Sequence, residues 1–235
     1  MRTSTVIVPT CERDAWFSDL AVAGIRKYWP EATVLEFRDT DTSTETKVPD
    51  DIRALCRESP YLRKQVDAPF LCEGVDDLYI LDADCFMFQR PTEFISRPYS
   101  YQGHTLHGHS DYPWGITVWG KLGHHFPVTS PLFCAGMFSA PMKMWAYNRE
   151  LMFDYLRQCR MMGYHRTSWE YSNVTLDQSL AAGLWRKTCQ DNPLPALAYP
   201  LGIPTVSMKI FHACYYKRRP EFKQFLADYK RRLDA

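Results

Sequence analysis

Asp82 and Asp84 are the residues whose types and spacing point most directly to chemistry. They form an Asp-x-Asp pattern directly after the apolar residues 78–81, and such a run bounded by charge is typical of a strand buried on both faces. Because side chains alternate along a strand, both carboxylates should project to one side, unless the strand ends before them. Two ionised carboxylates held together repel each other, and a divalent cation removes that repulsion. The pattern therefore predicts a Mg²⁺ or Mn²⁺ site, and the alternative is a pair of acids that only cap a loop.

The first forty residues have the pattern that would build a sheet around this strand. Residues 4–10 read as a buried strand, a helix follows from Asp14 or Ser18 to about Trp29, and residues 33–37 form the next strand. Strand, helix and strand in this order predict an α/β fold with a mostly parallel central sheet flanked by helices. Ligands of such sheets sit at the carboxyl ends of the strands. The candidates for nucleotide contacts, with ordinary loop chemistry as the alternative, are therefore the residues just past these ends: Thr10, Arg13 and Asp39.

A polar segment and a helix come between this unit and the acidic pair. The composition of residues 39–51 predicts a mobile surface loop, and residues 61–72 predict a helix that leads into the Asp-x-Asp strand. Arg63 and Lys64 on that helix could reach a phosphate. A solvated helix face explains the two side chains equally well.

Residues 130–140 predict a strand with small residues at its centre. Ala135 and Gly136 would leave the backbone there accessible to a ligand. The following residues, 141–162, have the apolar periodicity of a long packed helix.

The last third of the chain holds another acidic candidate. A helix that begins near Asn173 or Thr175 would carry Asp177 in its first turn, where an acid either favours the helix dipole or faces a cleft. Residues 204–211 predict a further strand, and a basic helix follows from residue 220 to the end.

Residues 99–126 are irregular in pattern and rich in glycine, aromatic residues and histidine. His104, His107 and His109 could form a transition-metal cluster. The alternative is an acceptor-binding loop, because exposed aromatic side chains are good platforms for sugar rings or bases.

The composition sets limits on the class of protein. A chain of 235 residues, 46% hydrophobic and 23% charged, is expected to form one soluble domain. A net charge of +1 gives no global argument for binding nucleic acid or an anionic membrane. Eight scattered cysteines without a Cys-x-x-Cys pair argue against structural zinc, and they fit reduced thiols in the cytoplasm. No segment has the pattern of a signal peptide or a membrane span.

Taken in order, these segments resemble the metal-dependent, nucleotide-sugar-using glycosyltransferases of the glycosyltransferase-A fold. The matching pieces span most of the chain and are residues 6–10 with Arg13, residues 79–84, residues 133–138, residues 176–180, and His212 with Lys217. Two departures stand out. Cys134 occupies a position where the family commonly has Asn, and residues 213–215 replace a glycine-rich turn after His212.

This resemblance implies a single Rossmann-like domain with a nucleotide-binding half, about residues 1–90, and an acceptor-binding half, about residues 91–235, that ends in the basic helix. Asp82, Asp84 and His212 would hold Mn²⁺ or Mg²⁺, and Lys217 would meet the diphosphate. Asp177 would be the general base if the transfer inverts the configuration at the anomeric carbon. It would hold sugar hydroxyls if the transfer retains that configuration. The implied contacts to the nucleotide sugar are Pro9, Thr10, Arg13, Asp39, Arg63, Lys64, Asp82, Ala83, Ala135, Gly136, Asp177, Gln178 and Lys217.

The acceptor and two rival classes stay open at this point. A related branch encoded by phages and kinetoplastids glycosylates hydroxymethylated pyrimidines in DNA, and duplex DNA is therefore one candidate acceptor. The basic residues that suggest it are Lys217, Arg218, Arg219, Lys223, Lys230, Arg231 and Arg232. The two rival classes are a nucleotidyltransferase of similar fold and a non-catalytic nucleotide-sugar-binding module. The nucleotidyltransferase is disfavoured because no Gly-rich phosphate loop follows the first strand.

Overall fold

The computed structural model describes residues 3–92, 95, 113–124, 135–163, 172–185, 209–213 and 216–235. The histidine cluster proposed above, His104, His107 and His109, lies outside these residues, as does Cys134.

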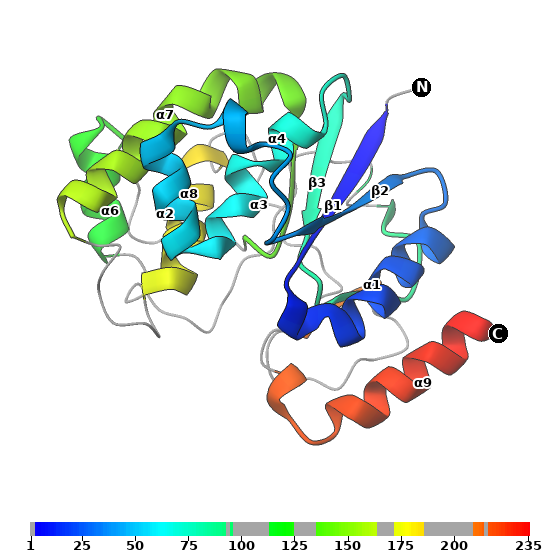
Figure 1. Cartoon of the computed structure of the whole chain (residues 1–235). Helices are drawn as coiled ribbons and strands as arrows, with labels where there is room; N and C mark the ends of the chain where they lie inside the picture. The colour runs from blue at the N-terminus through cyan, green and yellow to red at the C-terminus, as the bar shows by residue number, and fades with distance from the viewer. Residues whose placement is uncertain are drawn as a thin grey trace.

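The centre of the protein is a four-stranded sheet with the order β2-β1-β3-β5 (Figure 1). Strand β1 pairs in parallel with β2 and β3, and β5 runs antiparallel to β3. The prediction of a mostly parallel sheet is confirmed, and the antiparallel strand lies at its edge. The bounds are β1 Ser4–Thr10, β2 Thr33–Arg38, β3 Asp77–Leu81 and β5 Met137–Pro141.

A second, two-stranded sheet joins distant parts of the chain. Strand β4 (Cys85–Met87) pairs antiparallel with β6 (Ile210–His212), and Cys85 stands directly opposite His212. The residue that follows the acidic pair is therefore the neighbour of the late histidine.

Two hydrophobic cores lie on opposite faces of the central sheet. On β1, Val6 and Val8 pack into the core that contains residues of α1 and α9, while Ile7 packs into the core formed with α2, α6, α7 and α8. Strand β3 alternates in the same way, as a strand with a side-chain period of two must. Figure 1 shows α1 and α9 on one side of the sheet and the other helices across from them.

The helices of the described residues are mostly short before residue 113 and longer after it. The α-helices are α1 Ala15–Tyr28, α2 Asp50–Glu58, α3 Arg63–Val66, α4 Ala68–Leu71, α6 Pro113–Lys121, α7 Met142–Met161, α8 Ser172–Trp185 and α9 Phe222–Asp234. The 3-10 helices are η1 Glu12–Asp14, η2 Glu45–Lys47, η3 Pro60–Leu62 and η6 Tyr216–Arg218. No helix among the described residues combines the length and the apolar character needed to cross a membrane.

Three local predictions are wrong. The single helix expected over residues 61–72 is divided into η3, α3 and α4, because Pro69 lies in the first turn of α4 and cannot continue a preceding helix. Helix α6 occupies part of the region expected to be irregular. Helix α8 begins at Ser172, so Asp177 lies beyond its first turn.

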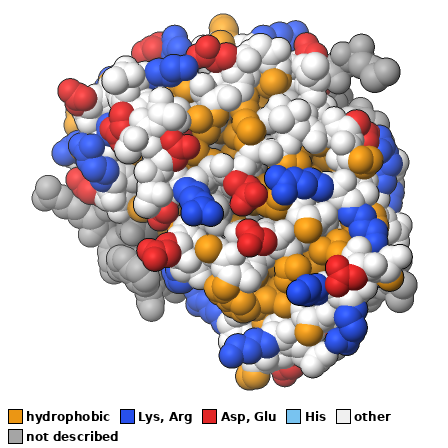
Figure 2. Space-filling view, turned by 45° about the vertical axis from the view of Figure 1, so that its right-hand side comes forward, with side chains coloured by type: hydrophobic (Ala, Val, Ile, Leu, Met, Phe, Trp, Pro, Cys, Tyr) orange, Lys and Arg blue, Asp and Glu red, His pale blue; other side chains and the backbone are white. Residues whose placement is uncertain are grey.

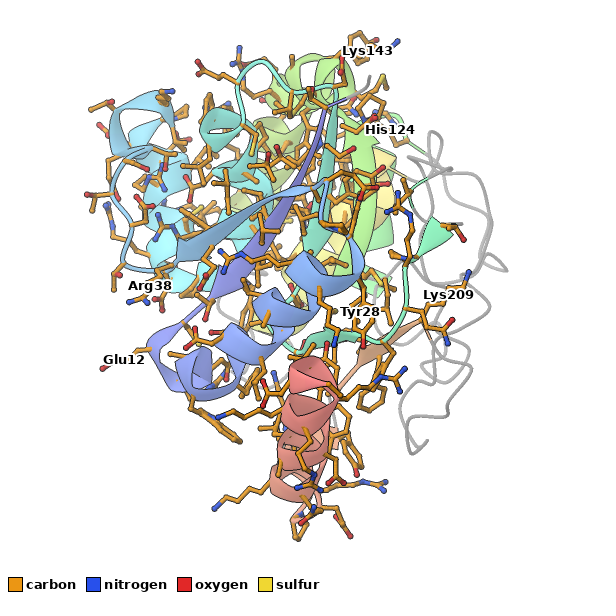
Figure 3. The ribbon with its side chains drawn as sticks, turned by 90° about the vertical axis from the view of Figure 1, so that its right-hand side faces the viewer. Glu12, Tyr28, Arg38, His124, Lys143 and Lys209 are labelled. Carbon is orange, nitrogen blue, oxygen red and sulfur yellow. The ribbon has the colours of Figure 1, made fainter. Side chains whose placement is uncertain are left out.

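Helix α9 packs closely against α1 and β4 through the side chain of Tyr229. The Tyr229 hydroxyl donates a hydrogen bond of 2.5 Å to the Met87 carbonyl, and it lies over Gly24 of α1. Further along the same contact, Arg232 Nε donates to the hydroxyl of Tyr28 at 3.3 Å, and Tyr28 is labelled beside α9 in Figure 3.

Gly24→Ala is expected to destabilise the protein, because the added Cβ would overlap the Tyr229 hydroxyl. Overpacking of this kind costs about 1–3 kcal/mol, which chemical denaturation would measure as a lower free energy of unfolding. Gly120→Ala in α6 is the matched control, since a Cβ there meets nothing within 4 Å. An equal stability of the two variants would contradict the close packing of α9 on α1.

Candidate functional site

The acidic pair lies in a turn at the carboxyl end of β3. The strand ends at Leu81, and Cys85 N–H donates to the Asp82 carbonyl at 2.9 Å, which closes the turn formed by residues 82–84. We call these residues the acid turn. Its ends are fixed from both sides, because Asp82 N–H donates to the Gly136 carbonyl and Ala213 N–H donates to the Asp84 carbonyl, each at 2.8 Å.

Asp84 is buried between two basic side chains. His212 Nε2 lies 3.2 Å from Asp84 Oδ1, and Lys217 Nζ lies 2.8 Å from Asp84 Oδ2. Burial raises the pKa of the Asp84 carboxyl, but the charges of His212 and Lys217 lower it more, so the net pKa lies well below its usual range. Oδ1 is shielded from water, and within the described residues no donor, His212 Nε2 included, is aligned with it in good hydrogen-bond geometry.

Gly136 forms the wall of the site between Asp82 and His212. A Cβ at this position would lie 2.9 Å from Asp82 Oδ2, 2.7 Å from His212 Cε1 and 3.0 Å from His212 Nε2. The absence of a side chain therefore leaves space where the carboxylate and the imidazole face each other. Asp82, Asp84 and His212, predicted as metal ligands, are brought together here.

Lys64 links the acid turn to helix α8. Its buried ammonium lies 3.0 Å from Asp82 Oδ1 and 2.8 Å from Asp177 Oδ2. Burial lowers the pKa of Lys64, but the charges of Asp177 and Asp82 raise it more, so the amine is held protonated. Gln65 Nε2 donates to the Asp177 carbonyl at 2.8 Å, which fixes this turn of α8 against α3.

The predicted nucleotide contacts at the first strand lie beside this cluster. Asp39 N–H donates to the Thr10 carbonyl at 3.1 Å, which joins the ends of β1 and β2. Arg13 is largely exposed and pairs with Asp14 at 3.3 Å. The Asp14 carboxylate is in turn 3.8 Å from Lys217 Nζ, so the loop after β1 reaches the same lysine that holds Asp84.

Arg63 lies beneath the loop that follows β2, away from the acid turn. Its guanidinium pairs with buried Asp67 at 2.8 Å and donates to the carbonyls of Asp39 and Asp41. The side chain of Gln178 lies outside the described residues. Ala83 and Ala135 are buried, and Pro9 is partly buried next to Thr10.

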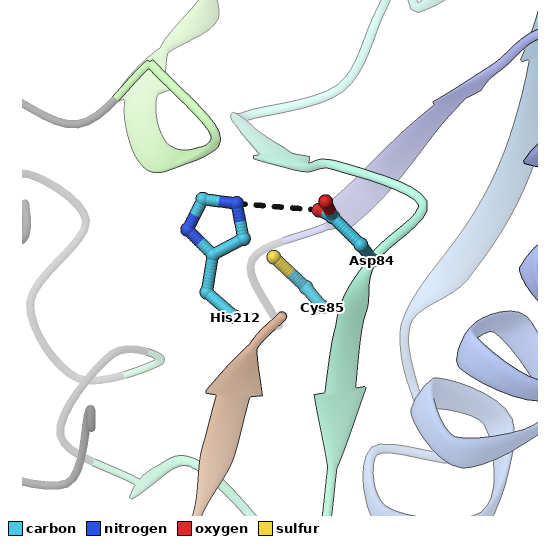
Figure 4. Close-up of side chains that lie close together, drawn as sticks. All are labelled: Asp84, Cys85 and His212. Carbon is cyan, nitrogen blue, oxygen red and sulfur yellow. Dashed lines mark ion pairs between the residues drawn. The ribbon is translucent and has the colours of Figure 1, made fainter. Parts of the chain in front are cut away.

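Three residues of the site have no role in the sequence-based prediction of its chemistry. Gln65 lies on a segment predicted as a helix, and Asp14 was considered only as a helix cap. Cys85 is the most informative of the three, since its Sγ, one oxygen of Asp84 and one ring nitrogen of His212 all lie within 4.8 Å of one another (Figure 4). Its place beside Asp84 in the sequence was the signal that could have drawn attention to it.

The residues of this cluster fit a divalent cation. The buried Asp84 Oδ1 faces His212 Nε2 without a well-aligned hydrogen bond, and Gly136 has no side chain beside Asp82 and His212. Carboxylate oxygens and an imidazole nitrogen are ligands that Mn²⁺ and related metals accept. Lys217 and Lys64 lie on either side and supply positive charge to a bound anion.

The comparisons with known proteins concern the fold. No protein-family profile matches the chain, and no curated protein is significantly similar to it in sequence. In structure the chain matches the galactosyltransferase LgtC, solved in complex with donor and acceptor sugar analogues, with a TM-score of 0.54 and 12% sequence identity. The match covers 98% of this chain and 95% of that chain. The chain therefore has the α/β fold of a glycosyltransferase, with a mostly parallel central sheet flanked by helices.

Proposed function

We propose that the protein is a glycosyltransferase that moves a sugar from a nucleotide-sugar donor to an acceptor hydroxyl. The observation that carries this proposal is the burial of Asp84 between His212 and Lys217, beside the space at Gly136. The similarity of the fold to a galactosyltransferase bound to donor and acceptor sugar analogues supports the same class of reaction.

Asp82, Asp84 and His212 would hold a divalent cation, Mn²⁺ or Mg²⁺. When bound, this cation would supply Lewis-acid stabilisation of the diphosphate leaving group. Lys217 adds a positive charge on the same side, because its ammonium already lies between Asp84 and Asp14.

Asp177 would bind the transferred sugar. Its carboxylate is paired with the buried ammonium of Lys64, and a carboxylate held in place in this way is a fixed acceptor for hydroxyl hydrogen bonds. This pairing favours the role of holding sugar hydroxyls over that of a general base. Lys64 would then set the position of Asp177 relative to Asp82.

Thr10, Arg13 and Asp39 would contact the nucleotide. They lie at the carboxyl ends of β1 and β2, the edge at which α/β sheets bind ligands. The link from Asp14 to Lys217 supports this position, since it connects the loop after β1 to the proposed diphosphate site.

The acceptor stays a prediction, with a glycan, a protein, a small molecule and duplex DNA as candidates. Two of the basic residues that suggested DNA are paired with acids, Lys217 with Asp84 and Arg231 with Asp228. Lys/Arg and Asp/Glu side chains are interspersed on the face that Figure 2 presents. A surface of mixed sign gives the DNA acceptor no added support.

The test is release of free nucleotide from a panel of UDP-sugars in the presence of Mn²⁺. We expect release with at least one donor, and Asp84→Asn is expected to reduce it to the level without protein. Asp228→Asn, which changes an exposed acid of α9, is the matched control and should retain the activity of the unmodified protein. Release from none of the donors would favour a binding module, and release that survives Asp84→Asn would refute the site.

A further inference from the structure

A cysteine sulfur lies beside the proposed cation site, although a site for Mg²⁺ or Mn²⁺ does not need one. Cys85 is a thiol and not half of a disulfide, and it is buried beside the acid turn. Its Sγ lies within 4.8 Å of an oxygen of Asp84 and of a ring nitrogen of His212. Figure 4 shows the three side chains converging from β4, from β6 and from the turn before β4.

The backbone explains why these three side chains meet. Cys85 and His212 are directly opposite in the antiparallel pair of β4 and β6, so their side chains lie on the same face. Asp84 precedes Cys85 and would point to the opposite face if the strand extended through it. Because Asp84 belongs to the acid turn and not to β4, its carboxylate is free of this alternation and reaches His212 from the side.

A second observation supports a ligand at this position. Asp84 is only 4% exposed, and its Oδ1 accepts no well-aligned hydrogen bond within the described residues, although His212 Nε2 lies 3.2 Å away. A buried oxygen without a partner costs free energy unless something positive satisfies it. Lys217 lies at the other oxygen, Oδ2, whereas Oδ1 faces the ring nitrogen of His212, one of the proposed ligands.

The spacing suits a metal that accepts sulfur, nitrogen and oxygen together. Zinc binds cysteine sulfur at about 2.3 Å and histidine nitrogen or carboxylate oxygen at about 2.0–2.2 Å, which places the ligands of a tetrahedral site roughly 3.3–3.8 Å apart. Asp84 Oδ1 and His212 Nε2 already lie 3.2 Å apart, and because the ligand atoms of the cluster all lie within 4.8 Å of one another, the further approach needed is at most about 1.5 Å. Three protein ligands leave a fourth position open, and Asp82 and Gly136 border it.

We propose that Cys85 is a direct ligand of this site, and that the site therefore binds a thiophilic divalent cation such as Zn²⁺ through Asp84, Cys85 and His212. Metal binding displaces the thiol proton to solvent and replaces the 3.6 Å hydrogen bond that Sγ now donates to the Gly136 carbonyl. The inference rests on the proposed function for the role of the site, and it extends that function by naming a sulfur ligand and a different class of metal.

The experiment uses Co²⁺ as an optical probe, added to the purified full chain after removal of bound metal. We expect a near-ultraviolet absorption band from charge transfer between thiolate and Co²⁺, and its loss in Cys85→Ser. Cys11→Ser is the matched control, because Cys11 is the described cysteine thiol that is least buried, and this variant should keep the band. Cys134→Ser and Cys214→Ser are tested in parallel and should keep it as well.

Affinity for Zn²⁺ is the second measurement. Loss of an outer-shell partner of a metal ligand weakens binding about 10–100-fold, so loss of a direct ligand in Cys85→Ser should weaken Zn²⁺ binding at least about tenfold. Binding of Mn²⁺, followed by the electron paramagnetic resonance of the free ion, should be unchanged because Mn²⁺ is held by oxygen and nitrogen.

X-ray absorption at the zinc edge tests the proposal without any variant, so a folding defect in Cys85→Ser cannot obscure the result. The zinc-loaded wild-type protein should show one sulfur at about 2.3 Å. Absence of sulfur around zinc, or a Co²⁺ band that survives Cys85→Ser, would overturn the proposal. Release of UDP from a donor together with zinc that has no sulfur ligand would refute this inference alone, whereas a sulfur-bound zinc without release from any donor would refute the proposed function alone.

Discussion

Gly136→Ala is expected to reduce the release of UDP at least about 100-fold while the protein stays folded. The added Cβ would lie 2.9 Å from Asp82 Oδ2 and 2.7 Å from His212 Cε1, so one or both side chains must move. A displacement of about 1 Å in a positioned catalytic group can cost about 100-fold in rate. The backbone of Gly136 does not have a positive φ, so the expected defect comes from the side chains that it contacts.

Two measurements separate this effect from general damage to the fold. The free energy of unfolding of Gly136→Ala should fall by no more than about 1–3 kcal/mol, the usual cost of overpacking. The affinity for Mn²⁺ should fall together with the rate, because Asp82 and His212 are both displaced. Gly120→Ala serves as the control for activity, since its Cβ meets nothing. Full activity in Gly136→Ala would show that the transferred group does not pass close to this wall.

Local patterns in the sequence were sufficient to predict the mostly parallel central sheet and the position of the acidic pair after β3. The apolar runs in β1 and β3 are continuous because both faces of these strands are covered by helices. Asp82 and Asp84 are close in the sequence, so their proximity in the structure needs no long-range information.

The role of Lys64 could not be predicted from local patterns. Its two partners are Asp82 in the acid turn and Asp177 on α8. Nothing near Lys64 in the sequence identifies either of them. A lysine on a polar helix is most often exposed, whereas this one is 4% exposed. Lys64 is buried and paired because α8 packs against η3 and α3, a contact that the local sequence pattern does not predict.

The segment after β2 is the clearest difference between prediction and structure. A polar composition predicted a mobile surface loop over residues 39–51, but the structure ties this segment to a buried acid. Asp67 accepts from Thr44 Oγ1 at 2.7 Å and pairs with Arg53 at 2.9 Å, while Arg63 pairs with its other oxygen at 2.8 Å. The loop is fixed because these arginines also donate to its carbonyls, among them the carbonyl of Thr44.

Asp67→Asn is therefore expected to lower the free energy of unfolding by about 3–5 kcal/mol, the cost of removing one partner from a buried ion pair. The substitution keeps the size of the side chain, so the loss reports the missing charge and not a cavity. Arg53 and Arg63 would both be left without their buried counter-charge, with side chains only 3% and 9% exposed. Urea denaturation measures the change, and faster hydrogen exchange of the amides of residues 39–47 should accompany it.

Asp51→Asn is the matched control, because its partner Arg157 is at the surface and the two side chains are 46% and 39% exposed. An exposed pair contributes about 0–1 kcal/mol, so this variant should be nearly as stable as the unmodified protein. Salt should also separate the two pairs, since it screens the exposed pair of Asp51 more strongly than the buried one of Asp67. If Asp67→Asn cost no more than Asp51→Asn, the segment after β2 would be held by its own backbone and not by the buried acid. Because Asp39 lies at the start of this segment and its N–H donates to the Thr10 carbonyl, the same measurement tests whether Asp67 fixes the edge where the nucleotide is proposed to bind.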